Sequence, residues 1–488
     1  MATRRIRAFK RWMKSHSIHY TDALHFTDDG ELAGISVKST RHLVEGELIA
    51  TIPKKSCLTI KTSRAKQMIE SVGLEGCFAL SVAVMYERSL GSGSVWAGYL
   101  QLLPYAEELP LVWSLDDLHS LLLGTELHKT VIEDKALVHE DWKDCILPLI
   151  DSDEFALDPK FFKVEDYFAA KSLVASRSFQ IDDYHGSGMV PLADLFNHKT
   201  DAEDVHFTAG DSDDSDEGMS DEENNSSDEM KTQTSQTEEN DSVANVADRT
   251  SDGPDLQSED TPDNPLVLEM ILVKDVEAGA EVFNTYGSMG NAALLHRYGF
   301  TELENPYDIV NIDMELVVKW SVSLITSRRS RARVSFWRKL GYSGCISQNS
   351  EYFEISYDGE PQLELLILLY IILLPEEAYT KLDLALAIKG NLAESNTTDL
   401  SHKVKLLCSD ISEISTDVLL TKAVRKALLS LADMRESLYG RGSLEADVED
   451  LSRCDSINER KLYHSLVLRV SERRIIQKLR SNAEKGPK

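Results

Sequence analysis

The sequence has little cysteine and no apolar run long enough to span a membrane. Its six cysteines, at positions 57, 77, 145, 345, 408 and 454, form no Cys-x-x-Cys pair, which excludes the usual zinc patterns and fits reduced thiols. The longest apolar run, LLILLYIILL at 365–374, is about half a membrane span and predicts a core helix. The N-terminal MATRRIRAFKRWMKSH is basic but has no apolar h-region, unlike a secretory signal, and its few serines disfavour an organelle transit peptide. We therefore expect neither a metal site nor a membrane partner.

Positive charge is also scarce. The 488 residues contain 82 Asp and Glu against 52 Lys and Arg, a formal charge of −30. Residues 211–264 hold nineteen of these acids against Lys231 and Arg249, so −17 belongs to this segment and −13 to the remainder. This balance argues against direct nucleic-acid binding. The segment has almost no large apolar residue, which predicts a disordered loop over about 209–264 that either steers basic protein tails or is a solvated tether.

Hydrophobic periodicity divides the remaining chain into two parts. Residues 20–60 alternate apolar and polar positions, as strands do, whereas about 75–165 show helical spacing. Strand patterns return after the acidic segment, and residues beyond about 306 are mostly helical. The pattern predicts an α+β fold: an extension at 1–19, a mixed domain at 20–300 and an all-α domain at 306–488. The basic end, residues 460–488 with a charge of +7, should form an amphipathic helix with a solvated basic face.

Two segments concentrate polar and aromatic groups. They are MVPLADLFNHKTDAEDVHF at 189–207 and VFNTYGSMGNAALLHRYGF at 282–300, and each begins like a strand and ends in a polar turn. Asp194, Asn197, His198 and Tyr286 are therefore candidate catalytic residues. The alternative is structural: Asn and His side chains often satisfy buried backbone groups in tight turns, and a tyrosine can cap a core.

Several motifs, in order along almost the whole chain, resemble the SET-domain protein lysine methyltransferases of the Rubisco large-subunit and ribosomal-protein branch. They are GISV at 34–37, SVWAGYLQLLP at 94–104, SRSF at 176–179, DLFNH at 194–198, and NTYG with the later YGF. The resemblance implies a SET fold of short strands with a helical insert, followed by a helical substrate-binding domain. One departure is Ser36, which replaces the second glycine of the family's Gly-x-Gly turn and has fewer accessible backbone conformations.

The resemblance also implies roles for individual residues. Asn197, His198, Tyr286 and the backbone around Gly34 and Ile35 would bind S-adenosyl-L-methionine. Tyr286 would orient the lysine amine as the catalytic residue, and Gly287 would allow the tight bend that points it inward. Arg177, Asp194 and Phe207 would lie on the substrate side. For Arg177 a helix-end ion pair is the alternative, and for Phe207 an inward-facing strand position.

The implied activity is methyl transfer to the ε-amine of a lysine on a protein substrate. The competing hypothesis is a non-catalytic SET-like scaffold that holds basic partners. We expect a monomer in the nucleus, the cytoplasm or both.

Overall fold

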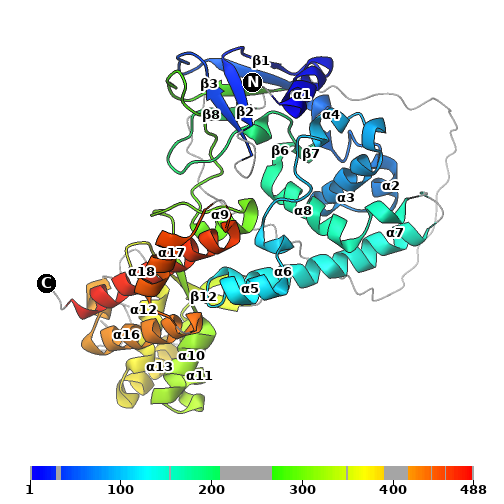
Figure 1. Cartoon of the computed structure of the whole chain (residues 1–488). Coiled ribbons are helices and arrows are strands. Elements are labelled where there is room, and N and C mark those ends of the chain that lie inside the picture. The colour runs from blue at the N-terminus through cyan, green and yellow to red at the C-terminus, as the bar shows by residue number, and fades with distance from the viewer. Residues whose placement is uncertain are drawn as a thin grey trace, which may run out of the picture.

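The computed structural model describes residues 3–28, 34–152, 155, 157–208, 266–347, 350–389, 416–440, 442–456 and 458–485. The expected disordered loop at 209–264 lies outside them. Two lobes are visible in Figure 1: strands and the first eight helices form one, and the helices that follow α9 form most of the other. Each lobe has its own cluster of buried apolar side chains. The α+β fold expected from the sequence is thus confirmed.

The largest sheet of the first lobe is antiparallel and has the strand order β1-β4-β9-β8. Its strands are β1 (His19–Tyr20), β4 (Leu48–Pro53), β9 (Val267–Leu272) and β8 (Val205–Thr208). Alternate residues of β9 are buried, as expected for a strand with one face against a core. Thr208 pairs with Glu269, so β8 and β9 bring the two ends of the acidic segment together. An insertion between such neighbours costs little loop-closure entropy.

Two smaller sheets complete the strand framework. One pairs β2 (Leu24–Asp28) with β3 (Ile35–Ser39), and the other has the order β5-β7-β6, from β5 (Leu58–Thr59), β7 (Gly186–Met189) and β6 (Ser178–Asp182). Ser36, the departure from Gly-x-Gly, lies within β3 opposite Thr27, with the two hydroxyl oxygens 2.5 Å apart. An extended strand accommodates serine without strain, so this position does not require glycine.

The insert between β5 and β6 is helical. It contains α2 (Lys66–Ser71), α3 (Gly76–Ser89), α4 (Ala97–Leu100), α5 (Leu115–Leu121), α6 (Leu127–Asp141), α7 (Leu147–Asp151) and α8 (Val164–Arg177). The hydroxyl of Ser114 caps α5 by accepting a hydrogen bond from the Asp117 N–H.

The N-terminal residues form a helix that packs into the first lobe. Helix α1 (Arg4–Ser15) buries Ile6, Phe9 and Met13. Its Trp12 donates a hydrogen bond from Nε1 to the carbonyl of Val95 at 2.7 Å. The segment expected to be an extension therefore shares the core of the strands and the insert.

The second lobe contains a small sheet besides its helices. Its helices are α10 (Met314–Leu324), α11 (Ser327–Lys339), α12 (Leu363–Leu373), α13 (Glu376–Lys389), α15 (Thr416–Leu419), α16 (Lys422–Glu436), α17 (Leu444–Arg453) and α18 (Arg460–Glu484). The strands β10 (Val310–Asp313), β12 (Ser350–Ile355) and β11 (Cys345–Ser347) pair in that order. The expectation of an all-α second domain therefore missed this sheet. Its signal is present in Phe353 and Ile355, which alternate with polar residues and are buried.

Most of the longest apolar run lies in α12, where seven of the eleven residues are buried and the other four half-buried, so the expected core helix is confirmed. Within the described part of the chain, no helix has both the length and the apolar content needed to cross a membrane.

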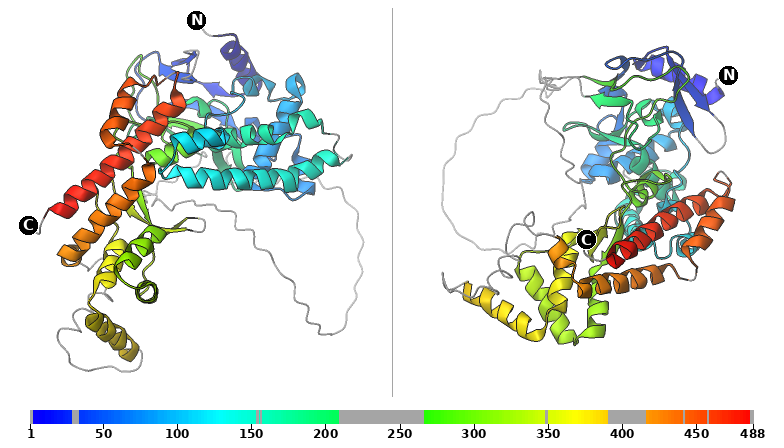
Figure 2. Two further views of the ribbon diagram at one scale, coloured as in Figure 1. Left: turned by 60° about the horizontal axis from the view of Figure 1, so that its bottom comes forward. Right: turned by 90° about the vertical axis from the view of Figure 1, so that its left-hand side faces the viewer.

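The C-terminal helix α18 differs from its expected arrangement. It packs along α16 and α17 and extends toward the first lobe (Figure 2). The solvated basic face predicted from its charge is wrong for Arg473, which is 2% exposed and lies near the carboxylate of Asp447. The exposed residues of α18 are Arg474, Gln477, Ser481 and Glu484, so the polar face is confined to the C-terminal half of the helix and is only partly basic.

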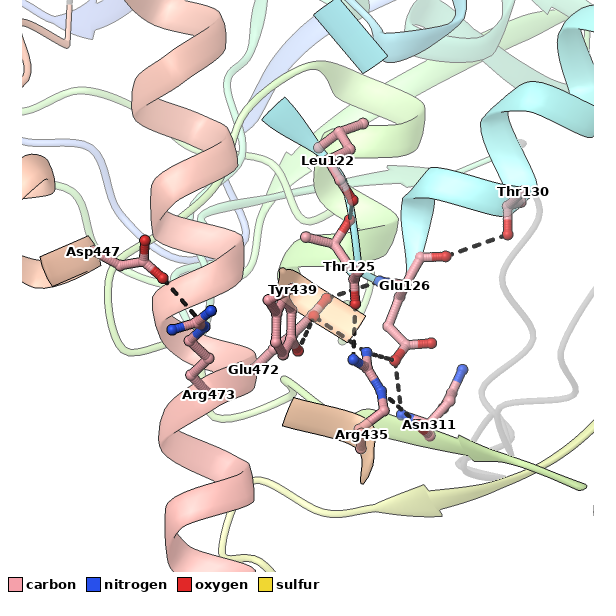
Figure 3. A network of polar contacts seen from close by, with 11 residues as sticks. Leu122, Thr125, Glu126, Thr130, Asn311, Arg435, Tyr439, Asp447, Glu472 and Arg473 are labelled. Atoms are coloured by element: carbon pink, nitrogen blue, oxygen red, sulfur yellow. Dashed lines mark hydrogen bonds and ion pairs between the residues drawn. The ribbon is translucent and has the colours of Figure 1, made fainter. Parts of the chain in front are cut away.

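A buried polar network joins the lobes (Figure 3). Its centre is Arg435 of α16, whose guanidinium lies 2.7 Å from Glu126 of the insert and 3.4 Å from Glu472 of α18. Arg435 also donates to the carbonyl of Asn311 at 3.0 Å. Glu472 accepts hydrogen bonds from the Glu126 N–H at 3.0 Å and from the Tyr439 hydroxyl at 2.6 Å. Arg435 thus contacts both acidic side chains, and burial raises the pKa of Glu472, which favours the protonated form of that residue and lowers the cost of burying it.

Replacing Arg435 should destabilise the junction strongly. Arg435→Met leaves Glu126 and Glu472 without their cation, and we expect the free energy of unfolding to fall by about 3–5 kcal/mol, measured by urea denaturation. Arg480→Met is the control, because Arg480 pairs with the exposed Asp433 and its loss should cost less than about 1 kcal/mol. Equal effects of the two substitutions would contradict a special role for the buried network.

Candidate functional site

The two polar segments singled out in the sequence meet in the structure. The Asn284 N–H donates a hydrogen bond to the carbonyl of Asn197 at 2.9 Å, and His198 forms an isolated parallel bridge with Asn284. Strand β3 runs beside the second segment, because the Val282 N–H donates to the carbonyl of Val37 at 2.8 Å. Residues of the DLFNH and NTYG motifs and of the strand that begins at Ile35 are therefore neighbours.

His198 connects the two segments through its ring. Its Nδ1 accepts a hydrogen bond from the backbone N–H of Tyr286 at 2.9 Å. Burial lowers the pKa of His198, which keeps the imidazole neutral and its acceptor lone pair available near neutral pH. The rings of His198 and Tyr286 stack with their centroids 5.0 Å apart. The side chain thus fixes both the backbone and the ring of Tyr286.

Tyr286 belongs to a small group of aromatic rings with His198, Tyr298 and Phe300, and this group is called the aromatic wall below. Its ring centroid lies 4.4 Å from that of Tyr298, and Phe300 lies 6.0 Å from His198. The Tyr286 hydroxyl donates to the carbonyl of Phe196 at 3.0 Å. Burial raises the pKa of both tyrosines. The phenols therefore stay protonated at neutral pH and act as hydrogen-bond donors rather than as bases.

The residue after Tyr286 must be one that tolerates a left-handed backbone. Gly287 has φ +98°, a conformation that residues with a Cβ adopt only with strain. This explains the tyrosine-glycine pair in the turn: glycine reverses the chain and the preceding phenol turns toward Phe196. Gly34, before β3, also has a positive φ of +72°, and a Cβ there would meet no atom within 4 Å.

Asn197 and Ile35 lie at the edges of this arrangement. The Asn197 side chain is partly exposed and donates from Nδ2 to the Glu281 carboxylate at 2.7 Å. Ile35 is buried at the start of β3. Beside the turn, a polar pocket of about 290 Å³ opens to the surface. Its lining includes Thr285, Gly287, Ser288, Tyr307, Asp201, Glu203 and Lys274.

Arg177 and Asp194 are hydrogen-bonded to each other close to Phe196, the residue whose carbonyl accepts the Tyr286 hydroxyl. Arg177, the last residue of α8, pairs with Glu107 at 2.5 Å and donates to the backbone carbonyl of Asp194 at 2.9 Å. This contact matches the helix-end ion pair that was the alternative role expected for Arg177 from the sequence. The Asp194 carboxylate is buried and accepts a hydrogen bond from the Tyr99 hydroxyl at 2.7 Å. Burial raises the pKa of Asp194 to about 6, although Arg177 and Tyr99 act in the opposite direction.

Phe207 lies on β8, opposite Met270 of β9. Its ring is partly buried, packs against the first core and lies 5.5 Å from the ring of Phe179. This arrangement matches the inward strand position, and a lining role toward the substrate stays a prediction.

The sequence did not indicate three residues that contact the candidate site residues. Tyr298 and Phe300 form part of the aromatic group, and Glu281 holds the Asn197 amide. The YGF motif after Tyr286 was the available signal for the first two. Glu281 carries no local signal, because its partner lies 84 residues away.

The raised pKa of Asp194 predicts a pH-dependent stability. In the native state this carboxyl keeps its proton to about pH 6, whereas its ordinary value is 3.8, so folding binds a proton between these values. The wild-type free energy of unfolding should therefore fall by about 2 kcal/mol relative to Asp194→Asn as the pH rises from about 4 to about 7. Denaturant titrations across this range measure the difference. Asp116→Asn, at an exposed carboxyl, is the control. Parallel stability curves for wild type and Asp194→Asn would contradict the prediction.

No family model matches the sequence. Among curated proteins, the sequence is 27% identical over 386 residues to ribosomal lysine N-methyltransferase 3 of Saccharomyces cerevisiae, with 68% of each chain covered. It is also 27% identical over 354 residues to N-lysine methyltransferase setd6 of Salmo salar, covering 69% of this chain and 66% of that protein. The chain thus matches about two thirds of the length of these relatives.

Solved structures show the same fold. The SET domain of LSMT bound to lysine and AdoHcy superposes with a TM-score of 0.62 at 18% identity, covering 98% of this chain and 91% of that chain. Rubisco LSMT bound to AdoMet gives the same TM-score at 16% identity, with 99% and 92% covered. The chain is thus similar in sequence to lysine N-methyltransferases and similar in fold to the SET domain of LSMT.

Proposed function

We propose that the protein transfers the methyl group of S-adenosyl-L-methionine to the ε-amine of a lysine in a protein substrate. The observation that carries the proposal is the arrangement of Tyr286: a neutral phenol fixed by His198, turned toward the Phe196 carbonyl and packed among aromatic rings. The names of the sequence relatives, both lysine methyltransferases, support the same reaction.

The residues present suit the cofactor. The open space at Gly34 lets a ligand approach the backbone without meeting a Cβ, and Ile35 follows at the start of β3. Amide and imidazole groups both donate and accept hydrogen bonds, which suits the amino-acid and adenine ends of the molecule. Asn197, His198, Tyr286 and the backbone of Gly34 and Ile35 would therefore hold it. When bound, the cofactor supplies an electrophilic methyl group on a sulfonium.

The protein must present the lysine as a neutral amine. A free lysine has a pKa near 10.4, so only about one in a thousand or fewer is neutral at pH 7. A passage lined by Tyr286, Tyr298 and Phe300 disfavours the ammonium form by excluding water. These residues would hold the neutral amine with its lone pair toward the methyl group that the bound cofactor would supply, and the proton of the methylated ammonium would pass to water.

Tyr286 and the carbonyl of Phe196 are the groups suited to orient the amine. The carbonyl accepts an amine N–H, and the phenol offers an oxygen whose raised pKa keeps it uncharged. Orientation in line with the methyl group reduces the entropic part of the barrier. Tyr286 is therefore our proposed catalytic residue.

We assign Arg177, Asp194 and Phe207 to the substrate side of the site. Arg177 pairs with Glu107, and Asp194 accepts a hydrogen bond from Tyr99. These contacts favour a role in positioning the aromatic wall rather than direct contact with the substrate. Phe207, at its partly buried position on β8, would line the approach of the lysine chain.

The expected substrate is a ribosomal or nuclear protein with an exposed lysine. The name of the yeast relative favours a ribosomal protein, and the acidic charge of the chain would favour basic tails. We propose a monomer in the nucleus, the cytoplasm or both. Among the described residues the cysteines, at 57, 77, 145, 345 and 454, form no disulfide, which supports a reducing compartment.

Tyr286→Phe should abolish most methyl transfer. It removes the hydroxyl that orients the amine and keeps the ring stack with His198, so we expect kcat to fall at least about 100-fold with the fold intact. Transfer of labelled methyl groups to proteins of a cell extract, followed by mass spectrometry of the labelled band, measures this.

Tyr105→Phe is the matched control, because it removes an exposed phenol hydroxyl that pairs with Asp166. Near-wild-type turnover of Tyr286→Phe would refute its catalytic role. Calorimetric titration with S-adenosylmethionine separates the two functions considered: binding supports the enzyme, and no binding supports the scaffold.

A further inference from the structure

Helix α9 (Asn291–Tyr298) carries part of the aromatic wall at its end. Tyr298 is its last residue, Gly299 closes it in a left-handed conformation and Phe300 follows. An eight-residue helix is not stable by itself in water, so its position depends on the groups around it. Whatever holds α9 therefore sets where Tyr298 and Phe300 lie relative to Tyr286.

The first turn of α9 is held by a carboxylate from outside the helix. The preceding Gly290 has no side chain that could cap it, and Asp308 takes this role. Its carboxylate accepts the Asn291 backbone N–H at 2.5 Å and the Asn291 Nδ2 at 2.8 Å. A negative charge at a helix N-terminus is favourable. Asp308 is itself 3% exposed and accepts a hydrogen bond from Ser471 of α18.

The other end of α9 is held by the same C-terminal helix. The Thr301 N–H donates to His464 Nδ1 at 3.1 Å, and the Thr301 hydroxyl lies 2.9 Å from that nitrogen. Burial, together with Arg460, lowers the pKa of His464 to about 4, so the ring is a neutral acceptor at neutral pH. Between the two contacts, Leu468 of α18 and Leu295 of α9 share one buried apolar cluster.

The segment after α9 also reaches the other polar motif. The Glu302 carboxylate accepts the Thr200 N–H at 3.1 Å, and the Thr200 hydroxyl lies 3.4 Å from His198 Nε2. Glu302 is tied back to α9, because its N–H donates to Asn291 Oδ1 at 2.7 Å. A shift of α9 would therefore disturb both sides of the aromatic wall.

We propose that Ser471 and His464 are positioning residues for methyl transfer. They hold the two ends of α9 and so keep Tyr298 and Phe300 against Tyr286 and His198. The spacing 464, 468 and 471 places these contacts on one face of α18. This inference rests on the proposed function, and it gives the second lobe a part in the chemistry besides substrate binding.

The test compares Ser471→Ala with Ser465→Ala. Both serines are buried on α18, but among the described residues the Ser465 hydroxyl has no hydrogen-bond partner, so Ser465→Ala serves as the matched control. Hydrogen exchange of residues 291–300, followed by mass spectrometry, reports on α9 whether or not the protein is active. Methyl transfer with S-adenosylmethionine and a lysine-containing substrate gives kcat and KM.

We expect Ser471→Ala to raise exchange over 291–300 and to lower kcat about tenfold with little change in KM, because the wall and not the docking surface is displaced. Ser471→Thr keeps the hydroxyl and should restore both values. Ser465→Ala should leave exchange and kcat as in the wild type. His464→Ala tests the other end of α9 and should have the same effects as Ser471→Ala. If one of these two variants fails to fold, the other still tests the inference.

Unchanged exchange over 291–300 in Ser471→Ala and His464→Ala would overturn the inference, as would equal effects of Ser465→Ala. Raised exchange with unchanged kcat in an active enzyme would also overturn it. If the wild type transfers no methyl group, the proposed function fails separately, and the exchange data still show whether α18 positions α9.

Discussion

The hydrogen bond from the Tyr286 backbone to His198 is the contact on which the site depends. It joins segments 88 residues apart and exists only while the imidazole is neutral, which burial ensures by lowering its pKa. The same ring stacks on Tyr286, so one side chain fixes the position of the phenol and its orientation. Without it, Tyr286 would sit on an irregular turn with no sheet or helix to hold it.

Positive φ angles occur in both segments that meet at this contact. Gly287 has φ +98°, and Leu192, just before Asp194, has φ +83° although it is a branched residue and fully buried. A non-glycine residue in this region costs of order 1–3 kcal/mol and persists only where its surroundings determine it. Here the Leu195 N–H closes a turn onto the Leu192 carbonyl, and β3 packs against the short helix at 193–195. A strained leucine in one segment and a glycine that the backbone requires in the other are consistent with a functional site rather than with ordinary turns.

Local patterns and motifs in the sequence predicted the strands, the helices and the candidate site residues. Alternation marked the strands, helical spacing marked the insert and α12, and the DLFNH and NTYG motifs indicated Asn197, His198 and Tyr286. It did not predict contacts between distant polar residues. Ser471 and Asp308 are 163 residues apart, and neither has neighbours that suggest a partner. The same limit explains Arg473: its charge predicts a solvated face, but packing between α17 and α18 buries it near Asp447.

Helix α18 connects the two lobes through adjacent residues. Glu472 belongs to the network of Arg435 and Glu126 at the insert, whereas Ser471 holds Asp308 and, through it, the start of α9. A helix that is buried along much of its length cannot rotate at one of these contacts without moving the other. The junction between the lobes and the aromatic wall are therefore mechanically one unit. Under the proposed function, a substrate protein that docked on the second lobe would contact a body that also sets the geometry around Tyr286.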